Sequence, residues 1–372
     1  KDVYMFSIYT PEYNESVDVL KSIRAVYPDA KHIGGGPHVN IFPDEMSLLF
    51  DAIVLGEGEK SIITAINDIL SNNLKPVYNQ EGSVDINSYP YPLRKFLPKT
   101  AVVEDGLLVG EHSSLEGTAV LFSRGCPFKC HFCANLTFGS VRFRCPKLIE
   151  EEIEYLKKEY QIEALALKDD NGIPINVKDA EPFLTAIGNT GIKWRGQSRA
   201  SGVKTDMVKL AKEAGCTDIA IGLESISERA LKLVHKGLRI DNVRKYIETL
   251  KEIGLGVRLH FIIGLPGEPD NIVEETLQFV EQTQPSSVLL SLLCPLPGSP
   301  LYMFPEKYGI KNISNDWEKF RVVFGGFDPK ELPEMVFEYE EITPWGKSMS
   351  NETILQNYVD LQNTLREGGL KF

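Results

Sequence analysis

Apolar strand-like stretches and amphipathic helical segments alternate along most of this chain. In residues 1 to about 70, the apolar stretches VYMFSI, KHIGGG and DAIVLGEGE are separated by segments such as SVDVLKSIRAVY, whose apolar residues recur every three or four positions. Apolar strands joined by crossover helices predict a parallel, doubly wound α/β sheet. About three strands are visible, fewer than the roughly five or six usual in such sheets. We therefore expect the natural chain to begin upstream of Lys1.

A second and longer series of strands begins at Ala119. Six apolar stretches, AVLFS, EALALK, IKWRGQ, DIAIGL, VRLHFIIG and SVLLSLLC, are separated by helical segments such as NVRKYIETLKEIG. Six β/α units predict a partial (β/α)6 barrel with its functional groups at the carboxyl ends of the strands. The predicted domains are a Rossmann-like unit (1–75), a linker rich in Pro, Gly, Asn and Ser (76–118), the partial barrel (119–300) and a C-terminal extension that caps the barrel or contacts substrate (301–372).

Composition excludes several classes of protein. The 372 residues are 42% hydrophobic and 25% charged, which is typical of a globular chain with room for two cores. The formal charge of -12 repels phosphate backbones, so we expect no nucleic-acid partner. No stretch approaches the ~20 apolar residues of a membrane span, and the first ten residues lack a signal-peptide pattern. These features predict a cytoplasmic protein without a membrane span.

Three of the six cysteines lie close together in the segment SRGCPFKCHFC, directly after the first barrel strand. Three thiolates can bind three irons of a [4Fe-4S] cluster and leave the fourth iron open for a ligand. We therefore predict Cys126, Cys130 and Cys133 as metal ligands. The alternative is a structural zinc site with Cys145 as a distant fourth ligand, but zinc sites favour paired C-x2-C elements. Cysteines 145, 216 and 294 have no partner spacing and are interpreted as buried small hydrophobic residues.

With these motifs, residues 119 to 300 resemble the radical S-adenosylmethionine (SAM) superfamily. The resemblance rests on the spacing C-x3-C-x2-C and on Phe132, the aromatic residue before the last cysteine. It implies that the open iron chelates the amino and carboxylate groups of SAM. One electron then cleaves SAM to methionine and a 5'-deoxyadenosyl radical, and an external donor such as flavodoxin or ferredoxin supplies that electron. The resemblance does not identify a catalytic residue in addition to the cofactor ligands.

The resemblance also implies SAM contacts at other strand ends. Glu224 and Ser225 in GLES would bind the ribose hydroxyls, because a carboxylate accepts two hydrogen bonds at once; the alternative for Glu224 is a solvated acid at a helix start. Arg199 and Arg258 would each pair with the methionine carboxylate or, equally, form a structural ion pair within the barrel. Two further pairs complete the predicted set, Asp169 with Asp170, where the family often has a glycine-rich segment at the methionine amine, and Gly264 with Gly267 in HFIIGLPGE, at the adenine. Turn chemistry alone could also explain those two glycines.

The N-terminal unit resembles the later half of the cobalamin-binding domain that precedes many radical SAM methyltransferases and cyclases. The motifs S-x-Y-T, IGGGPHV and AIVLGEGE carry this resemblance, and no D-x-H-x-x-G motif is present, so the histidine that coordinates cobalt in some cobalamin proteins is absent or lies upstream. A lone histidine in a turn is more often solvated, which is the alternative for His38. The residues implied at the corrin or its nucleotide tail are Gly34, Gly35, Gly36, His38, Gly56 and Glu57.

Three functions follow from these motifs. The first is a cobalamin-dependent radical SAM methyltransferase acting on an unactivated carbon. The second is a radical SAM enzyme that performs cyclisation, coupling or redox chemistry without cobalamin, with the N-terminal sheet as scaffold. The third is an iron-sulfur sensor without turnover, which would have no reason to carry GLES and GLPGE at consecutive strand ends. The substrate stays open among small molecules, lipids and peptides, because substrate contacts in such enzymes come from loops.

Overall fold

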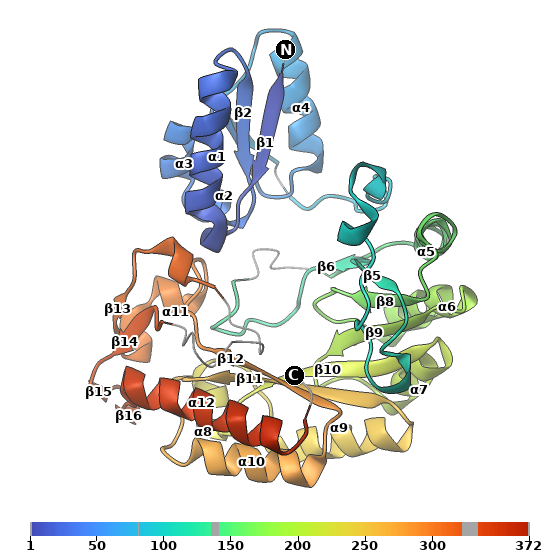
Figure 1. Ribbon diagram of the computed structural model, residues 1–372, viewed down its shortest axis with the longest axis vertical. Helices are drawn as coiled ribbons and strands as arrows, with labels where there is room; N and C mark the ends of the chain where they lie inside the picture. The colour runs from blue at the N-terminus through green and yellow to red at the C-terminus, as the bar shows by residue number, and fades with distance from the viewer. Residues whose placement is uncertain (1, 81, 135–140, 322–333, 371–372) are drawn as a thin grey trace.

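Two parallel sheets make up the chain. The computed structural model describes residues 2–80, 82–134, 141–321 and 334–370. The N-terminal unit lies at the top of the view in Figure 1, and the larger six-stranded sheet lies below it. β1 starts beside the N-terminus and runs toward the larger sheet. Because the N-terminal sheet is parallel, all its strands end at the edge that faces the larger sheet.

The N-terminal sheet has four parallel strands in sequential order. They are β1 (Val3–Ser7), β2 (Lys31–Gly35), β3 (Ala52–Leu55) and β4 (Val77–Asn79). β4 extends the unit beyond the predicted boundary at residue 75, and the sequence missed this strand because its three residues, VYN, are too few to show a period. The helices are α1 (Tyr13–Val26), α2 (Pro37–Ile41), α3 (Pro43–Leu49) and α4 (Glu59–Leu70).

Two small cores hold this unit together, one on each face of its sheet. On one face, Leu20 of α1, Val39 of α2 and Met46 of α3 pack with Ile53 of β3. On the other face, Ala65 and Ile69 of α4 pack against β2, β3 and β4. Helices on both faces confirm the predicted doubly wound arrangement.

The larger sheet is the predicted partial barrel. Its six strands are all parallel and follow the order β12-β11-β10-β9-β8-β5, so each strand lies beside the next one along the chain. All six were predicted from their apolar runs, because strands buried on both faces read as nearly continuous hydrophobic segments. They are β5 (Gly117–Val120), β8 (Ala164–Leu167), β9 (Lys193–Ser198), β10 (Cys216–Glu224), β11 (Gly256–Ile263) and β12 (Ser287–Leu292).

Amphipathic helices cover the outside of the barrel and share one continuous core with it. The predicted helical segments coincide with α5, α7, α9 and α10, whose apolar stripes recur at helical spacing. In α6, which the sequence had not singled out, the side chain of Asn176 caps the first turn by accepting a hydrogen bond from the Lys178 N–H. The bounds are α5 (Pro146–Tyr160), α6 (Val177–Asn189), α7 (Thr205–Glu213), α8 (Glu228–Leu233), α9 (Ile240–Glu252) and α10 (Ile272–Thr283).

The C-terminal extension contacts both units. Its long helix α12 (Asn351–Glu367) packs on α10, β11 and β12, and a short 3-10 helix, Trp317–Lys319, contacts α1 of the N-terminal unit. Among the described residues, no helix is long and apolar enough to cross a membrane. The remaining short elements are α11 (Pro300–Met303), β13 (Ile310–Ile313), β14 (Phe337–Tyr339), β15 (Ile342–Thr343) and β16 (Gly346–Lys347).

Candidate functional site

The three predicted cysteine ligands share one loop at the carboxyl end of β5. Two short antiparallel strands, β6 (Ser123–Arg124) and β7 (Arg142–Phe143), pair at the two ends of this loop. Cys130 is buried, and Cys126 and Cys133 are half-buried. In the part of the chain that the structure describes, no group of three or more His, Cys, Asp or Glu side chains is placed to hold a single metal ion.

Hydrogen-bond donors from neighbouring strand ends point at two of the sulfurs. Asn171, after β8, donates from Nδ2 to the Cys126 Sγ over 3.8 Å. Arg199, after β9, donates from Nη1 to the Cys130 Sγ over 3.4 Å. Burial raises the pKa of the Cys126 thiol. Hydrogen bonds from the Phe128 N–H and from Asn171 offset only part of this rise. Donors on sulfur are what a thiolate-bound iron-sulfur cluster uses to set its reduction potential, so this donor set fits such a cluster.

Asp169 holds the start of the cysteine loop in place. It is fully buried and accepts hydrogen bonds from the Phe122 N–H at 3.1 Å and from the Ser123 hydroxyl at 2.5 Å. Burial raises its pKa to about 6, even though these hydrogen bonds act in the opposite direction. The predicted contact between Asp169 and the methionine amine therefore competes with contacts inside the protein. Asp170 lies beside it, close enough for its charge to act on Cys126.

The two residues of the predicted ribose site, Glu224 and Ser225, lie at the carboxyl end of β10 and have different hydrogen-bond partners. Glu224 has a left-handed φ of 72°, and its Oε1 accepts a hydrogen bond from the Lys236 Nζ at 2.7 Å. Both side chains are largely buried. Lys236 also lies over the ring of Phe132, the aromatic residue of the cysteine motif, at 5.6 Å. These contacts bring the predicted ribose carboxylate and the cysteine loop together, through a lysine that no sequence motif singled out.

Ser225 joins the end of β10 to the glycine motif that follows β11. Its hydroxyl donates to the Oε1 of Glu268 over 2.7 Å, and the Gly264 N–H donates to the Oε2 over 2.9 Å. Sequence reasoning quoted Glu268 in the motif HFIIGLPGE but assigned it no role. Tyr339 of β14 donates its hydroxyl to the Gly264 carbonyl at 2.8 Å, so the extension also fixes this turn.

Both predicted adenine glycines adopt left-handed conformations and pack closely against the chain itself. Gly264 has φ 94° and Gly267 has φ 83°. A Cβ atom at Gly264 would lie 2.8 Å from the Ile354 side chain, and one at Gly267 would lie 2.5 Å from Leu233. Glycine is therefore required here by φ and by close packing, which is the turn explanation that the sequence left open.

Arg258 has the ion pair that was its alternative interpretation. Its Nε donates to the Asp218 Oδ1 at 2.5 Å, and its Nη2 donates to the Leu107 carbonyl at 2.9 Å. Asp218 is fully buried, and both residues lie early in β11 and β10, away from the carboxyl ends of the strands. The structure thus separates Arg258 from the cysteine loop, whereas Arg199 reaches Cys130.

In the N-terminal unit, the predicted corrin residue Glu57 instead contacts the barrel. Its carboxylate accepts hydrogen bonds from Arg142 at two points, both 2.8 Å, from Arg124 at 3.0 Å and from the Val84 N–H at 2.7 Å. Arg124 also pairs with Glu59. Burial acts to raise the pKa of Glu57, but these donors outweigh it and lower the pKa to about 2. Glu57 thus ties the end of β3 to both ends of the cysteine loop, β6 and β7.

The other predicted corrin residues are partly engaged in packing. A Cβ at Gly34 would lie 2.6 Å from the Phe50 ring, and one at Gly36 would lie 2.6 Å from the Ile8 backbone. Gly35 has only ordinary contacts, and so has Gly56 at the end of β3, where a Cβ atom would lie 3.9 Å from the Asn79 side chain and φ is 73°. Gly56 is exposed and donates its N–H to the Asn40 Oδ1 at 2.6 Å, whereas Gly34 and Gly36 serve the fold.

His38 is fully buried rather than solvated in a turn. The sequence missed that it lies in a short helix, α2, because five residues are too few to show a helical repeat. Its Nδ1 is 3.1 Å from the Thr10 hydroxyl, and the rings of Tyr13, Phe42 and Trp317 surround it. Burial lowers its pKa to about 4. His38 is thus neutral and enclosed.

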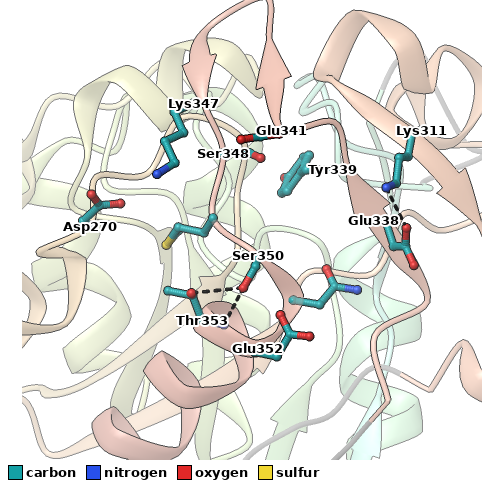
Figure 2. A pocket seen from close by; sticks show the side chains of 12 residues that line it. Asp270, Lys311, Glu338, Tyr339, Glu341, Lys347, Ser348, Ser350, Glu352 and Thr353 are labelled. Carbon is teal, nitrogen blue, oxygen red and sulfur yellow. Dashed lines mark hydrogen bonds and ion pairs between the residues drawn. The ribbon is translucent and has the colours of Figure 1, made fainter.

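Two of the hollows on the described surface differ in their relation to the predicted site. One of about 780 Å³ opens beside the start of α12 and is lined by charged and polar side chains, including Asp270, Lys311, Glu338 and Lys347 (Figure 2). Lys311 pairs with Glu338 at 3.1 Å across its rim. No predicted site residue lines it. The other hollow, of about 690 Å³, lies against the cysteine loop and includes Arg199.

Comparison with known proteins agrees with this geometry. Residues 120–280 match the model of the radical SAM superfamily. An uncharacterized methyltransferase of Pyrococcus horikoshii is 28% identical over 350 residues, which cover 87% of this chain and 73% of the relative. An anaerobic magnesium-protoporphyrin IX monomethyl ester cyclase of Rubrivivax gelatinosus is 26% identical over 345 residues, which cover 87% of this chain and 61% of the cyclase.

Solved structures of similar fold include a cobalamin-bound enzyme. The fold is similar to that of the radical SAM methyltransferase TsrM from Kitasatospora setae, solved with cobalamin and a [4Fe-4S] cluster bound, at a TM-score of 0.61 and 18% identity. The match covers 80% of this chain and 63% of that chain, so this chain spans less than two thirds of that protein. The predicted partial barrel preceded by a Rossmann-like sheet is confirmed.

Proposed function

We propose that this enzyme, whose residues 120–280 form a radical SAM domain, cleaves SAM at a [4Fe-4S] cluster held by Cys126, Cys130 and Cys133. The observation that carries the proposal is the pair of side-chain donors, Asn171 and Arg199, aimed at two of the three sulfurs from neighbouring strand ends. A zinc site with Cys145 as the fourth ligand has less support, because zinc sites favour paired C-x2-C elements and this loop has the spacing C-x3-C-x2-C.

The chain's own residues divide the work of holding cluster and substrate. When bound, the cluster supplies the single electron needed to cleave the sulfonium of SAM. Asp169 keeps the start of the cysteine loop in position. Glu224, held by Lys236 at the end of β10, is placed to accept hydrogen bonds from the ribose hydroxyls. Glu268 braces the turn of Gly264, where backbone would approach the adenine.

Methyl transfer with cobalamin is the finer part of the proposal. Its support is the edge of the N-terminal sheet, whose strands end toward the barrel and where Gly56 is exposed, together with the cobalamin-bound structure of similar fold. A bound cobalamin would supply the methyl group. Among the residues first predicted for it, Gly56 is exposed at this edge, whereas the side chains of Glu57 and His38 have partners within the protein.

A second candidate, a radical SAM enzyme that works without cobalamin, is favoured by those same partners. If Glu57 and His38 serve only to attach the N-terminal unit, that unit is a scaffold. The similarity to a cyclase is compatible with such chemistry. Methyl transfer from labelled SAM to a product would count against this candidate.

Anaerobic reconstitution tests both candidates. The chain is loaded with iron and sulfide, then given dithionite and SAM, with and without hydroxocobalamin, and 5'-deoxyadenosine is followed by chromatography. The control is the variant with Cys126→Ala, Cys130→Ala and Cys133→Ala. Deoxyadenosine from the wild type alone supports the radical chemistry, and a corrin retained through gel filtration supports methyl transfer. A well-formed cluster without cleavage would contradict the proposal.

A further inference from the structure

A cluster of exposed cations lies beside the cysteine loop. Lys129, within the loop, and Lys232 and Arg239, on the facing segment, are exposed and line the hollow of about 690 Å³. None of these three forms an ion pair with another described residue. The single acid in the lining, Glu228, already accepts a hydrogen bond from the Ile240 N–H at 3.1 Å. We call Lys129, Lys232, His235 and Arg239 the basic surface.

The basic surface is joined directly to the residues between the predicted cluster ligands. His131 donates its backbone N–H to the Val234 carbonyl at 2.8 Å, and the rings of His131 and His235 stack at 4.9 Å. On the other side of the hollow, the guanidinium of Arg199 lies 3.9 Å above the Phe128 ring and reaches the Cys130 sulfur. A partner seated on the basic surface would therefore contact the loop that carries the thiols.

The charge of the whole chain makes this surface unusual. The protein carries a formal charge of -12, so an acidic protein is repelled by most of it and attracted to the basic surface. Such an arrangement directs the encounter of the two partners to one place. A long polyanion such as nucleic acid would extend beyond the basic surface onto the acidic remainder, whereas a small acidic protein would not.

We propose that the basic surface is the docking site of an acidic one-electron donor protein of the flavodoxin type. This inference rests on the proposed function, which requires one electron at the cysteine loop. In the transfer, the donor is oxidised by one electron and the cluster is reduced by one, and no bond forms or breaks at the interface. Weak redox complexes have small interfaces, commonly below about 1,200 Å² of buried surface. A surface with a few unpaired cations is therefore large enough to bind such a donor.

Binding of an acidic flavodoxin to the full chain is the first test. The variant carries Lys232→Glu and Arg239→Glu, and the control carries Lys147→Glu and Lys245→Glu, two exposed lysines on α5 and α9. Both double variants change the net charge equally. Fluorescence anisotropy of labelled flavodoxin should give a Kd raised roughly tenfold or more in the first variant and near the wild-type value in the control. With increasing salt concentration, the Kd of the wild type should also rise more steeply than the Kd of the Lys232→Glu and Arg239→Glu variant. Equal affinity of the two variants would overturn the proposal.

The source of the electron separates this inference from the proposed function. SAM cleavage is measured once with reduced flavodoxin and once with dithionite, which needs no docking site. We expect Lys232→Glu with Arg239→Glu to lower flavodoxin-driven cleavage roughly tenfold and to leave dithionite-driven cleavage unchanged. An equal loss with both reductants would place the surface in the SAM or substrate site and overturn the docking proposal. No cleavage by the wild type with dithionite would contradict the proposed function instead, and the binding measurement would still decide the docking site.

Discussion

Glu268 is a fully buried carboxyl group whose protonation affects the stability of the fold. Burial raises its pKa to about 7, although Ser225 and the N–H groups of Gly264 and Leu265 donate to it. In the unfolded chain the pKa returns to about 4.5. Between these two values the folded state holds a proton that the unfolded state has lost. The stabilisation is therefore fully present below about pH 4.5 and is lost as the pH rises through about 7.

We expect Glu268→Gln to remove this pH dependence. Between pH 5 and pH 8, the wild type should lose up to about 3 kcal/mol of unfolding free energy that the variant retains, because an amide cannot ionise. Urea unfolding followed by circular dichroism at both pH values measures the difference, and other titrating groups cancel in the comparison. Glu352→Gln, in the exposed first turn of α12, is the control. Parallel curves for Glu268→Gln and the wild type would refute the expectation.

The carboxylate of Glu224 should matter for SAM binding without affecting the cluster. In Glu224→Gln, one oxygen and the negative charge are lost, so two ribose hydroxyls can no longer both donate to a charged acceptor. We expect the Kd for SAM, measured by anaerobic calorimetry, to rise about tenfold, with iron content and visible absorbance unchanged. Glu228→Gln, on the neighbouring helix α8, should bind SAM like the wild type. An unaltered Kd in Glu224→Gln would return this residue to a purely structural role.

Residue types could be predicted from the sequence where one short motif carries the chemistry. The three cysteines, Phe132 and Glu224 lie in such motifs, and the structure brings the cysteine loop to Glu224. The partners could not be predicted, because they lie outside the motifs. Lys236 beside Glu224 belongs to no motif, and Asp218 beside Arg258 was only one of many acids. A motif identifies a group, whereas the fold selects its partner.

At the scale of elements, Glu57 connects a strand end of one unit to two strands of the other. Glu57→Ala would leave Arg124 and Arg142 without their shared carboxylate while both remain partly buried. We expect the unfolding free energy to fall by about 2 kcal/mol. Less iron should also be retained after reconstitution, because β6 and β7 hold the two ends of the cysteine loop. Urea unfolding and iron analysis test this expectation.

A graded pair of variants strengthens that test. Among the described residues, Glu59 forms an ion pair with Arg124 alone, so Glu59→Ala should have a smaller effect on stability and iron content than Glu57→Ala. A larger effect of Glu59→Ala than of Glu57→Ala would show that the ion pair between Glu57 and Arg142 contributes little to stability. Lowering the pH should decrease the unfolding free energy, as Glu57→Ala does. Because its folded pKa is about 2, the stabilisation from Glu57 is present above about pH 4.5 and is lost as the pH falls toward 2.

Periodicity predicted the elements whose burial is one-sided or complete over several residues. All six barrel strands and helices such as α1 and α9 are of this kind. β4 and α2 escaped prediction because three and five residues respectively are too few to show a repeat. The link from Glu57 to Arg142 spans 85 residues of sequence and crosses a predicted linker, so no local pattern could reveal it.

At the scale of the whole molecule, the C-terminal extension fastens the N-terminal unit to the barrel. Trp317 packs on the rings of His38 and Phe42 at 5.4 and 5.2 Å, and the Asn14 side chain donates to Glu318 at 3.1 Å. The same extension reaches the site through Tyr339, whose hydroxyl donates to the Gly264 carbonyl. The extension thus links the two units as Glu57 does, from another side.

Trp317→Ala should loosen the N-terminal unit without unfolding the barrel. The variant removes an aromatic ring that encloses His38, so we expect about 2 kcal/mol less stability in the N-terminal unit. Hydrogen–deuterium exchange read by mass spectrometry should then show faster exchange in α1 and α2 and unchanged exchange in β10 and β11. Phe304→Ala, an exposed aromatic residue of the same extension, serves as the control and should leave all four elements protected. Faster exchange throughout the barrel would mean that Trp317 supports the whole fold, whereas no change in α1 and α2 would mean that Glu57 and its arginines alone hold the two units together.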